Sequence, residues 1–243
     1  MASPRVSRRL RRYLKENVFD STHKIVPRLY DFSLLLLRDN LAGNGVILNF
    51  GCGPFPVELN ARVLHLNEGF PTRFLNIDIS PEACTRHKEE TGTLVTLHKN
   101  RFPHDRYLSA DIERLRLKTV RKALRDETHH GGVAISFLEY YSPPRAVKMI
   151  SRMLTLCDTL VCSVRVDPEF EKIFDAEHHL KLYFFRDLQE LKHELVHDDW
   201  TIEKIIGVPR YSDGERGIFL MLLTNNYRPT RRNHLSAYSC DYR

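Results

Sequence analysis

Predicted strands and helices alternate along most of the chain, and this alternation limits the possible folds more than any other feature. Apolar runs typical of buried strands occur at residues 45–50, 72–80, 106–112, 131–141 and 159–166. Segments with helical spacing of apolar residues follow them at 57–69, from 81 onward, and at 117–127, 142–157 and 182–196. A chain ordered in this way is expected to form a parallel sheet with helices on both faces.

The last two apolar runs differ from the others because a short, turn-forming segment joins them. Residues 200–208 and 217–225 flank the sequence PRYSDGER, which contains proline, serine, aspartate and glycine. Two strands joined in this way are expected to form an antiparallel hairpin at the end of the sheet.

Two glycines lie one residue apart where the first predicted strand ends, in the sequence GCGPFP. Gly51 and Gly53 can adopt a positive φ, and neither has a Cβ that would obstruct a ligand. The following helix would offer free N–H groups at its start. Ligands of parallel sheets bind beyond the carboxyl ends of the strands, where this turn is expected to lie. A GxG sequence alone is also compatible with a simple sharp turn.

Acidic residues stand at the ends of the next two predicted strands. Asp78 ends the second strand, where a carboxylate can bind both hydroxyls of a ribose. Asp111 ends the third strand and can accept a hydrogen bond from an adenine amine, beside the backbone and apolar side chain of Ile112. The fourth strand ends in FLEYYSPP, which adds polar and aromatic groups at the same edge.

In this order, the motifs resemble those of the class I S-adenosylmethionine-dependent methyltransferases, from about residue 40 to residue 225. ILNFGCGPFP is similar to the glycine motif, FLNIDIS to the ribose-binding strand, and LSADIERL to the adenine loop. ISFLEYYSPPRAVKMISRML is similar to the strand and helix beside the reaction site. The resemblance implies a Rossmann-like, doubly wound α/β fold. Its sheet would be seven-stranded and mostly parallel, with a C-terminal antiparallel hairpin, and its cofactor would be S-adenosylmethionine.

The resemblance also implies which residues bind the cofactor. They are Asn49, Gly51, Cys52, Gly53, Pro54, Asp78, Ile79, Asp111, Ile112 and Leu138. Two positions depart from the family pattern, which usually has an acid where this chain has Asn49 and often a glycine where it has Phe55. Asn49 can form a hydrogen bond to the methionine end of the cofactor, but not the stronger charge-assisted bond. Lower affinity or lost activity are therefore alternatives. The form GCGPFP also resembles nicotianamine synthase, over a few residues.

Candidate catalytic residues follow the fourth and fifth predicted strands. Glu139 and Tyr140 lie in the first group, and His178 and His179 lie in AEHHLKLYFF. Small-molecule methyltransferases of the ubiquinone-pathway type carry a similar segment of glutamate, histidine and aromatic residues. A base would assist transfer to a hydroxyl or an acidic carbon. Core packing of the tyrosine and a solvated helix start for the histidines are the alternative interpretations.

Three hypotheses about the function remain open, and two of them differ in the methyl acceptor. A small-molecule acceptor is favoured by AEHHLKLYFF and by the lack of a nucleobase-methyltransferase motif. An RNA acceptor is favoured by the basic residues at 5–15, 98–106 and 228–233. A catalytically inactive, cofactor-binding module that keeps the fold is the third hypothesis, and the oligomeric state is not determined by the sequence.

Composition restricts the class of protein further. The net charge is +6, much of it near the two ends, so we expect a basic helical N-terminal extension at 1–40, a domain at 41–226 and a basic tail at 227–243. No apolar run approaches the roughly 18 residues of a membrane span. The five cysteines form no CxxC pair, which argues against a metal site and favours reduced thiols in the cytoplasm. A mitochondrial presequence is the alternative reading of the first residues.

Overall fold

The computed structural model describes residues 29–37, 46–54, 56, 58, 73–97, 105–124, 129–166, 172–175, 180–212 and 217–226. Several expectations lie outside these residues. They concern most of the N-terminal extension, the tail at 227–243, Phe55, most of the predicted helix at 57–69, and the candidate catalytic residues His178 and His179.

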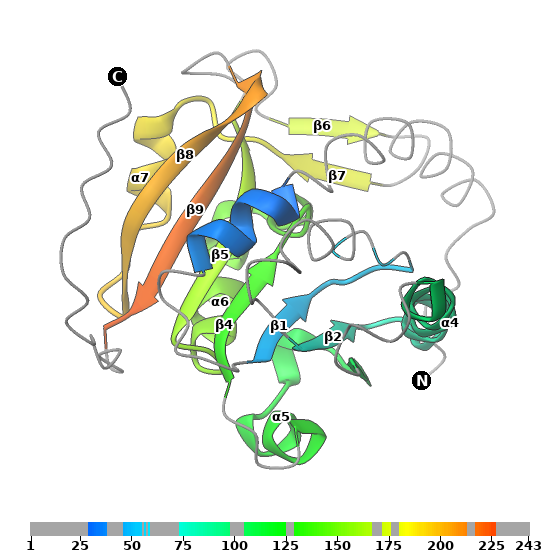
Figure 1. Cartoon of the computed structure of the whole chain (residues 1–243). Coiled ribbons are helices and arrows are strands. Elements are labelled where there is room, and N and C mark those ends of the chain that lie inside the picture. The colour runs from blue at the N-terminus through cyan, green and yellow to red at the C-terminus, as the bar shows by residue number, and fades with distance from the viewer. Residues whose placement is uncertain are drawn as a thin grey trace, which may run out of the picture.

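The main sheet of the described residues has seven strands (Figure 1). They are β1 (Val46–Phe50), β2 (Arg73–Asp78), β3 (Arg106–Ser109), β4 (His129–Ala134), β5 (Thr159–Val166), β8 (Trp200–Ser212) and β9 (Gly217–Asn225). Their order is β3-β2-β1-β4-β5-β9-β8. Neighbouring strands from β3 to β5 are parallel, whereas β9 is antiparallel to both β5 and β8. The expected parallel sheet with a terminal hairpin is confirmed.

Helices connect these strands and cover the sheet. They are α4 (Pro81–Leu97), α5 (Leu117–Leu124), α6 (Pro143–Leu154) and α7 (Leu188–Glu194), with the 3-10 turns η3 (Ile112–Arg114) and η4 (Leu138–Tyr140) and a further helix at 29–37. From β1 the chain runs to β2 and β3 on one side, then returns to β4 and β5 on the other. Right-handed connections therefore place α4 on the face opposite to α5 and α6. The reversal between β1 and β4 is the switch point where ligands of such sheets bind.

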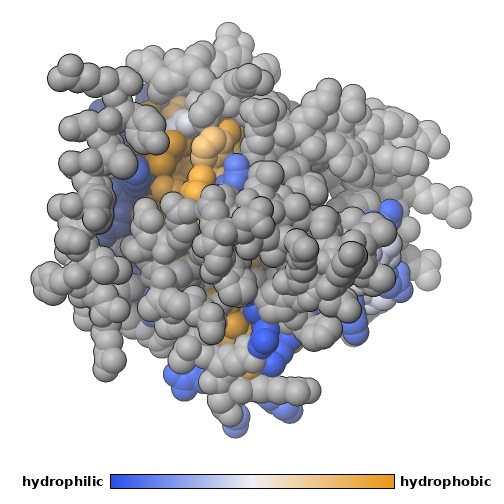
Figure 2. All heavy atoms as spheres, in the orientation of Figure 1, coloured by the Kyte–Doolittle hydropathy of each residue, from blue (hydrophilic) through white to orange (hydrophobic). Residues whose placement is uncertain are grey.

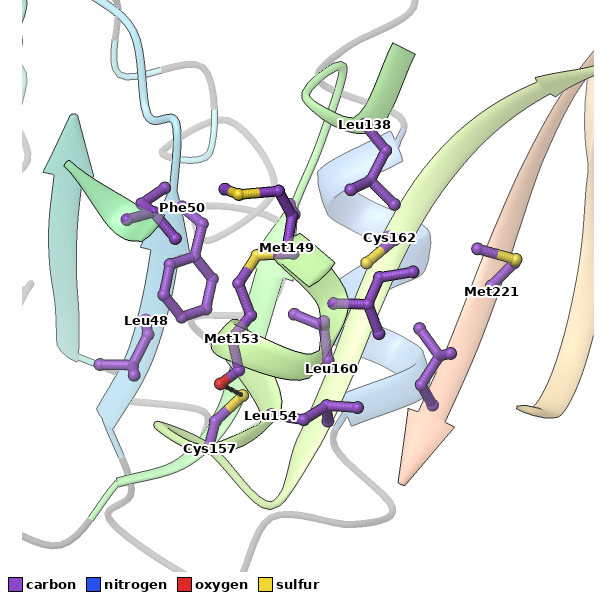
Figure 3. Close-up of a cluster of buried hydrophobic side chains, with 14 of the residues drawn as sticks. Leu48, Phe50, Leu138, Met149, Met153, Leu154, Cys157, Leu160, Cys162 and Met221 are labelled. Atoms are coloured by element: carbon purple, nitrogen blue, oxygen red, sulfur yellow. Dashed lines mark hydrogen bonds between the residues drawn. The ribbon is translucent and has the colours of Figure 1, made fainter. Parts of the chain in front are cut away.

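The core lies in two layers because β1 buries alternate residues on opposite faces of the sheet. Leu48 and Phe50 belong to the layer that contains α5, α6 and α7, part of which Figure 3 shows, and Met149 and Met153 of α6 belong to the same cluster. Ile47 belongs to the second layer, which the helix at 29–37 covers. Among the described helices, none is both long and apolar enough to cross a membrane.

Three local predictions were wrong, although the fold was right. The fourth strand ends at Ala134 and not at 141, because Ser136 has a φ of 50° and the turn η4 follows. The third strand ends at Ser109, before η3. The predicted helix at 182–196 begins only at Leu188, where the Asp187 side chain accepts the N–H of Glu190 and caps it.

The segment before α7 forms a strand instead of a helix. This strand, β7 (Leu180–Tyr183), pairs antiparallel with β6 (Lys172–Asp175). The sequence LYFF contains three aromatic residues, which favour a strand, and the helical spacing of the later leucines does not extend into it. This small second sheet lies outside the seven-stranded one.

Gly132 of β4 tests how tightly the first core layer is packed. A Cβ added there would lie 2.8 Å from Cε2 of Phe50 and 2.9 Å from Sγ of Cys157, both fully buried. We expect Gly132→Ala to lower the free energy of unfolding by about 1–3 kcal/mol through overpacking. The control is Gly92→Ala in α4, where a Cβ would meet no atom within 4 Å. It should raise stability by roughly 0.5–1 kcal/mol, because alanine favours a helix. Urea denaturation measures both, and equal effects would contradict the packing argument.

Candidate functional site

The glycine turn after β1 is held against the end of β2. Gly51 and Gly53 have φ values of 69° and 66°, which other residues rarely adopt. The N–H groups of Gly51 and Cys52 both donate to the carbonyl of Ile77, at 2.8 Å and 3.1 Å. A Cβ on Gly51 would lie only 2.5 Å from Cδ2 of Phe137, whereas a Cβ on Gly53 would meet no atom of the described residues within 4 Å. The turn is therefore closely packed at Gly51 and open at Gly53.

Asp78 connects this turn to the start of α4. One carboxylate oxygen accepts the N–H of Gly53 at 2.9 Å, and the other accepts the N–H of Ser80 at 2.9 Å. A carboxylate has about four acceptor positions, so each oxygen can still accept a further hydrogen bond. Ile79 follows with 70% of its side chain exposed, which places an apolar surface beside the carboxylate.

Asp111 lies at the same edge, on the neighbouring strand. The N–H of Ala110 donates to the carbonyl of Asp78 at 2.8 Å, so the two acidic segments adjoin. The Asp111 side chain caps η3 by accepting the N–H of Glu113 at 3.0 Å, and its other oxygen lies 3.6 Å from Nε of Arg114. Asp111 therefore caps η3, and its carboxylate keeps further acceptor capacity.

An aromatic wall borders the site on the β4 side, and it comes from the segment FLEYYSPP, which was expected to bring aromatic groups to this edge. The Phe137 ring covers Gly51, and the ring of Tyr141 lies 5.2 Å from it. Cζ of Arg145 lies 5.1 Å above the Tyr141 ring, and its Nε donates to Glu113 of η3 at 2.7 Å. The wall thus runs from the glycine turn to η3. The sequence did not indicate which rings face the turn, because the strand was predicted to continue through these residues and it ends at Ala134.

Burial raises the pKa of Tyr141 above its usual value of 10.0, and nearby Arg145 opposes this effect. The carboxylates of Glu113, Asp111 and Asp78 raise this pKa further. Tyr141 therefore stays protonated at neutral pH and can donate a hydrogen bond.

Asn49 is fully buried and its side-chain atoms are paired within the protein. Its Oδ1 accepts from the Tyr30 hydroxyl at 2.8 Å, and its Nδ2 donates to Oδ1 of Asn76 at 2.8 Å. An ionised acid at this position could accept from Tyr30 but could not donate to Asn76. The amide at position 49 is thus explained by the packing of the helix at 29–37 against β1.

Three other predicted cofactor residues are also buried. Leu138 and Ile112 belong to the first core layer, and Figure 3 shows Leu138 directed toward the core. Cys52 is 5% exposed, and hydrogen bonding with Cys84 together with burial raises the pKa of its thiol. Any contact of these residues with a ligand would have to come from their backbone. Pro54, directly after Gly53, is half-buried.

The two described catalytic candidates differ in their surroundings. Glu139 is 8% exposed and its carboxylate lies 2.9 Å from Nε of Arg165, on β5. Tyr140 is 37% exposed. Glu139 therefore ties η4 to β5, while Tyr140 reaches the surface. Among the described residues, no group of three or more histidine, cysteine or acidic side chains is placed to hold a metal ion.

A buried pair, Glu58 and His87, supports the glycine turn from the α4 side. Both side chains are fully inaccessible, and Nε2 of His87 lies 2.8 Å from Oε1 of Glu58. Nδ1 of the same ring lies 3.1 Å from the carbonyl oxygen of Gly53. The Gly53 carbonyl and the Glu58 carboxylate both accept hydrogen bonds, so both ring nitrogens of His87 need a proton. Both contacts are therefore satisfied when the imidazole is protonated. Burial lowers the pKa of His87, but the charge and hydrogen bond of Glu58 and the Gly53 carbonyl outweigh it, so the pKa is raised above 6.5.

The raised pKa predicts how stability depends on pH. The contribution of His87 should be fully present below its unfolded-state value of 6.5 and be lost as pH rises through the higher folded-state value. We expect wild-type protein to lose free energy of unfolding as the pH rises above 6.5, relative to His87→Gln. Urea denaturation at several pH values measures this difference.

Two variants serve as controls for this pH dependence. Glu58→Gln removes the charge that raises the pKa, and it should flatten the profile as His87→Gln does. His193→Gln changes an exposed histidine of α7 and should keep the wild-type slope. Parallel profiles for wild type and His87→Gln would show that the buried pair does not titrate in this range.

Comparison with known proteins gives structural matches only. No protein-family model and no curated protein sequence matches the chain. Magnesium protoporphyrin IX methyltransferase from Synechocystis PCC 6803, solved with bound S-adenosylmethionine, aligns over 93% of this chain and 99% of its own, with a TM-score of 0.56 and 13% identity. This chain has the class I methyltransferase fold.

Two further structures share the class I methyltransferase fold of this chain. An S-adenosylmethionine-dependent methyltransferase from Clostridium acetobutylicum ATCC 824 has a TM-score of 0.57 and 11% identity, over 88% of this chain and 96% of its own. The small RNA methyltransferase HEN1 has a TM-score of 0.55 and 14% identity, and the match spans 80% of this chain but only 24% of HEN1. At these identities the likeness establishes the fold and leaves the activity to be argued from the site.

Proposed function

We propose that this protein transfers a methyl group from S-adenosylmethionine to an acceptor. The observation that carries the proposal is the position of Asp78, whose carboxylate holds the N–H of Gly53 at the switch point of the sheet. In this position the acid can accept both hydroxyls of a ribose while it fixes the turn against which the ligand lies.

The surrounding residues fit an adenosine-containing cofactor. The space beside Gly53 admits a ligand against the backbone, because a side chain there would meet no atom within 4 Å. Ile79 offers an exposed apolar surface to a base, next to Asp78. Asp111, on the adjoining strand end, has acceptor capacity for an adenine amine.

Bound S-adenosylmethionine would supply a methyl group already activated by a sulfonium, so the protein mainly has to position the acceptor and exclude water. Phe137 and Tyr141 provide an apolar wall for this purpose. Arg165 holds the carboxylate of Glu139 in place, with its Nε 2.9 Å from Oε2. We propose Glu139 and Tyr140, with His178 and His179 from outside the described residues, as the groups that orient or deprotonate the acceptor.

The acceptor class rests on less direct support. A small molecule is our leading proposal, based on the segment AEHHLKLYFF. RNA is the second candidate, and a basic groove beside α6 favours it. The pairing of Asn49 with Tyr30 and Asn76 gives the amide at this position a structural role, so Asn49 is weak support for the hypothesis of an inactive module.

Replacing Asp78 tests the cofactor site. We expect Asp78→Ala to weaken binding of S-adenosylmethionine by about 1.5–3 kcal/mol, the value of hydrogen bonds to a charged group. This corresponds to a dissociation constant raised tenfold or more. Isothermal titration calorimetry measures the change. Transfer of a labelled methyl group to pools of metabolites and of RNA then distinguishes the two acceptor classes.

A matched control separates local from general effects. Asp158 immediately precedes β5 and therefore lies at the opposite edge of the sheet. Asp158→Ala should leave the affinity for S-adenosylmethionine unchanged. Wild-type protein that releases no heat with the cofactor, or an Asp78→Ala variant that binds as wild type does, would refute the assignment.

A further inference from the structure

A groove runs beside α6, outside the proposed cofactor site. Its volume is about 680 Å³. The residues that line it are Glu113, Ser142, Pro144, Arg145, Lys148, Ser151, Arg152 and Thr155. Cations and hydroxyl groups thus dominate the lining, with a single carboxylate. Lysine, arginine, serine and threonine are the side chains that bind phosphate oxygens in protein–nucleic acid complexes.

Two cations of this groove keep an uncompensated charge. Within the described part of the chain, Lys148 forms no ion pair. Arg152 donates to the carbonyl of Leu115, a neutral acceptor, and its buried Nε has no hydrogen-bond partner in the described part of the chain. Arg145, in contrast, is neutralised by Glu113. The groove is therefore net positive along most of α6.

The positive surface continues from the groove onto α5. Arg116 directly follows Leu115, whose carbonyl binds Arg152, so it lies beside the groove. Its side chain and those of the following cations are exposed, and no ion pair involves them in the described residues: Arg116, Lys118, Arg121 and Lys122. Figure 2 shows hydrophilic side chains gathered at the lower edge of the molecule, around α5.

We propose that the groove beside α6, together with Arg116, binds the phosphate backbone of single-stranded RNA. Lys148 and Arg152 lie one helical turn apart, about 6 Å between their Cβ atoms, and this repeat suits successive phosphates of a strand. Ser151 and Thr155 can also hydrogen-bond a ribose 2′-hydroxyl, the group that distinguishes RNA from DNA. The proposal goes beyond methyl transfer and does not depend on cofactor binding.

The position and shape of the groove favour a strand over a membrane. The large apolar side chains that are exposed among the described residues are Ile79, Tyr140 and Val196, and none of them lines the groove. Membrane-surface helices, in contrast, insert apolar side chains between the lipids. At the start of α6 the groove reaches Arg145, which covers the Tyr141 ring of the aromatic wall. A bound strand could thus extend toward the site, where aromatic rings can stack a base.

Fluorescence anisotropy with a labelled single-stranded RNA of about ten nucleotides tests the proposal, in the absence of S-adenosylmethionine. Wild-type protein should bind, and its affinity should fall steeply as the salt concentration rises. The double variant Arg116→Glu/Lys148→Glu should bind at least roughly tenfold more weakly, with a salt slope reduced by about two because two phosphate contacts are lost. The single variant Lys148→Ala should lower the affinity for RNA severalfold. It tests the same contact if the double variant does not fold.

The control is the double variant Lys88→Glu/Lys192→Glu, which changes the net charge equally at exposed positions of α4 and α7. It should retain much tighter binding than the groove variant. No salt-dependent binding by wild type, or equal losses in the two double variants, would overturn the proposal. Equal affinity for single-stranded DNA of the same sequence, or binding to anionic lipid vesicles but not to RNA, would also overturn it. A protein that binds RNA but not the cofactor would refute only the proposed methyl transfer.

Discussion

The hydrogen bonds between the turn at 51–53 and the end of β2 are the constraint on which the candidate site depends. The carbonyl of Ile77 accepts two N–H groups of the turn, and the carboxylate of Asp78 accepts a third. These bonds use backbone donors that a parallel strand pair leaves unpaired where its strands end. They therefore join the ends of β1 and β2 into one rigid edge, and the ligand-facing groups keep fixed positions relative to each other.

Two contacts hold this edge in place, one on the β4 side and one on the α4 side. The Phe137 ring covers Gly51 from the β4 side, at a distance that excludes any side chain at position 51. On the α4 side, His87 binds the Gly53 carbonyl and is itself held by Glu58. Burial makes the His87–Glu58 contact costly to break, because its polar groups would lose their partners without access to water. The open direction at Gly53 is thus the one in which a cofactor can approach.

The candidate residues show which parts of a site can be predicted from a sequence. Gly51, Gly53, Asp78 and Asp111 were found because parallel strands bring their carboxyl ends to one edge, so position along the chain determines position in space. Leu138 and Ile112 share the same motifs, yet their side chains face the core while that of Ile79 is exposed. A short motif does not specify this direction, since it depends on the twist of the strand end and on the turn that follows.

The basic groove also shows that a sequence pattern does not specify the surroundings of a side chain. The spacing of Arg145, Lys148 and Arg152 on one side of a helix is visible in the sequence. Which of them is neutralised depends on η3, whose Glu113 lies far from α6 in the chain but pairs with Arg145. Net charge at a surface is therefore a property of neighbours brought together by folding, and the pattern of one helix does not reveal it.

The sequence by itself determined the order of the seven strands of the main sheet along the chain, the terminal hairpin and the glycine turn, because hydrophobic periodicity and backbone freedom are local properties. The tertiary structure alone decided the early end of β4, the wall from Phe137 to Arg145, and the pairs His87–Glu58 and Asn49–Tyr30. Each of these joins residues from different elements. Their geometry follows from how the helices pack on the sheet, and no segment of the chain specifies that packing alone.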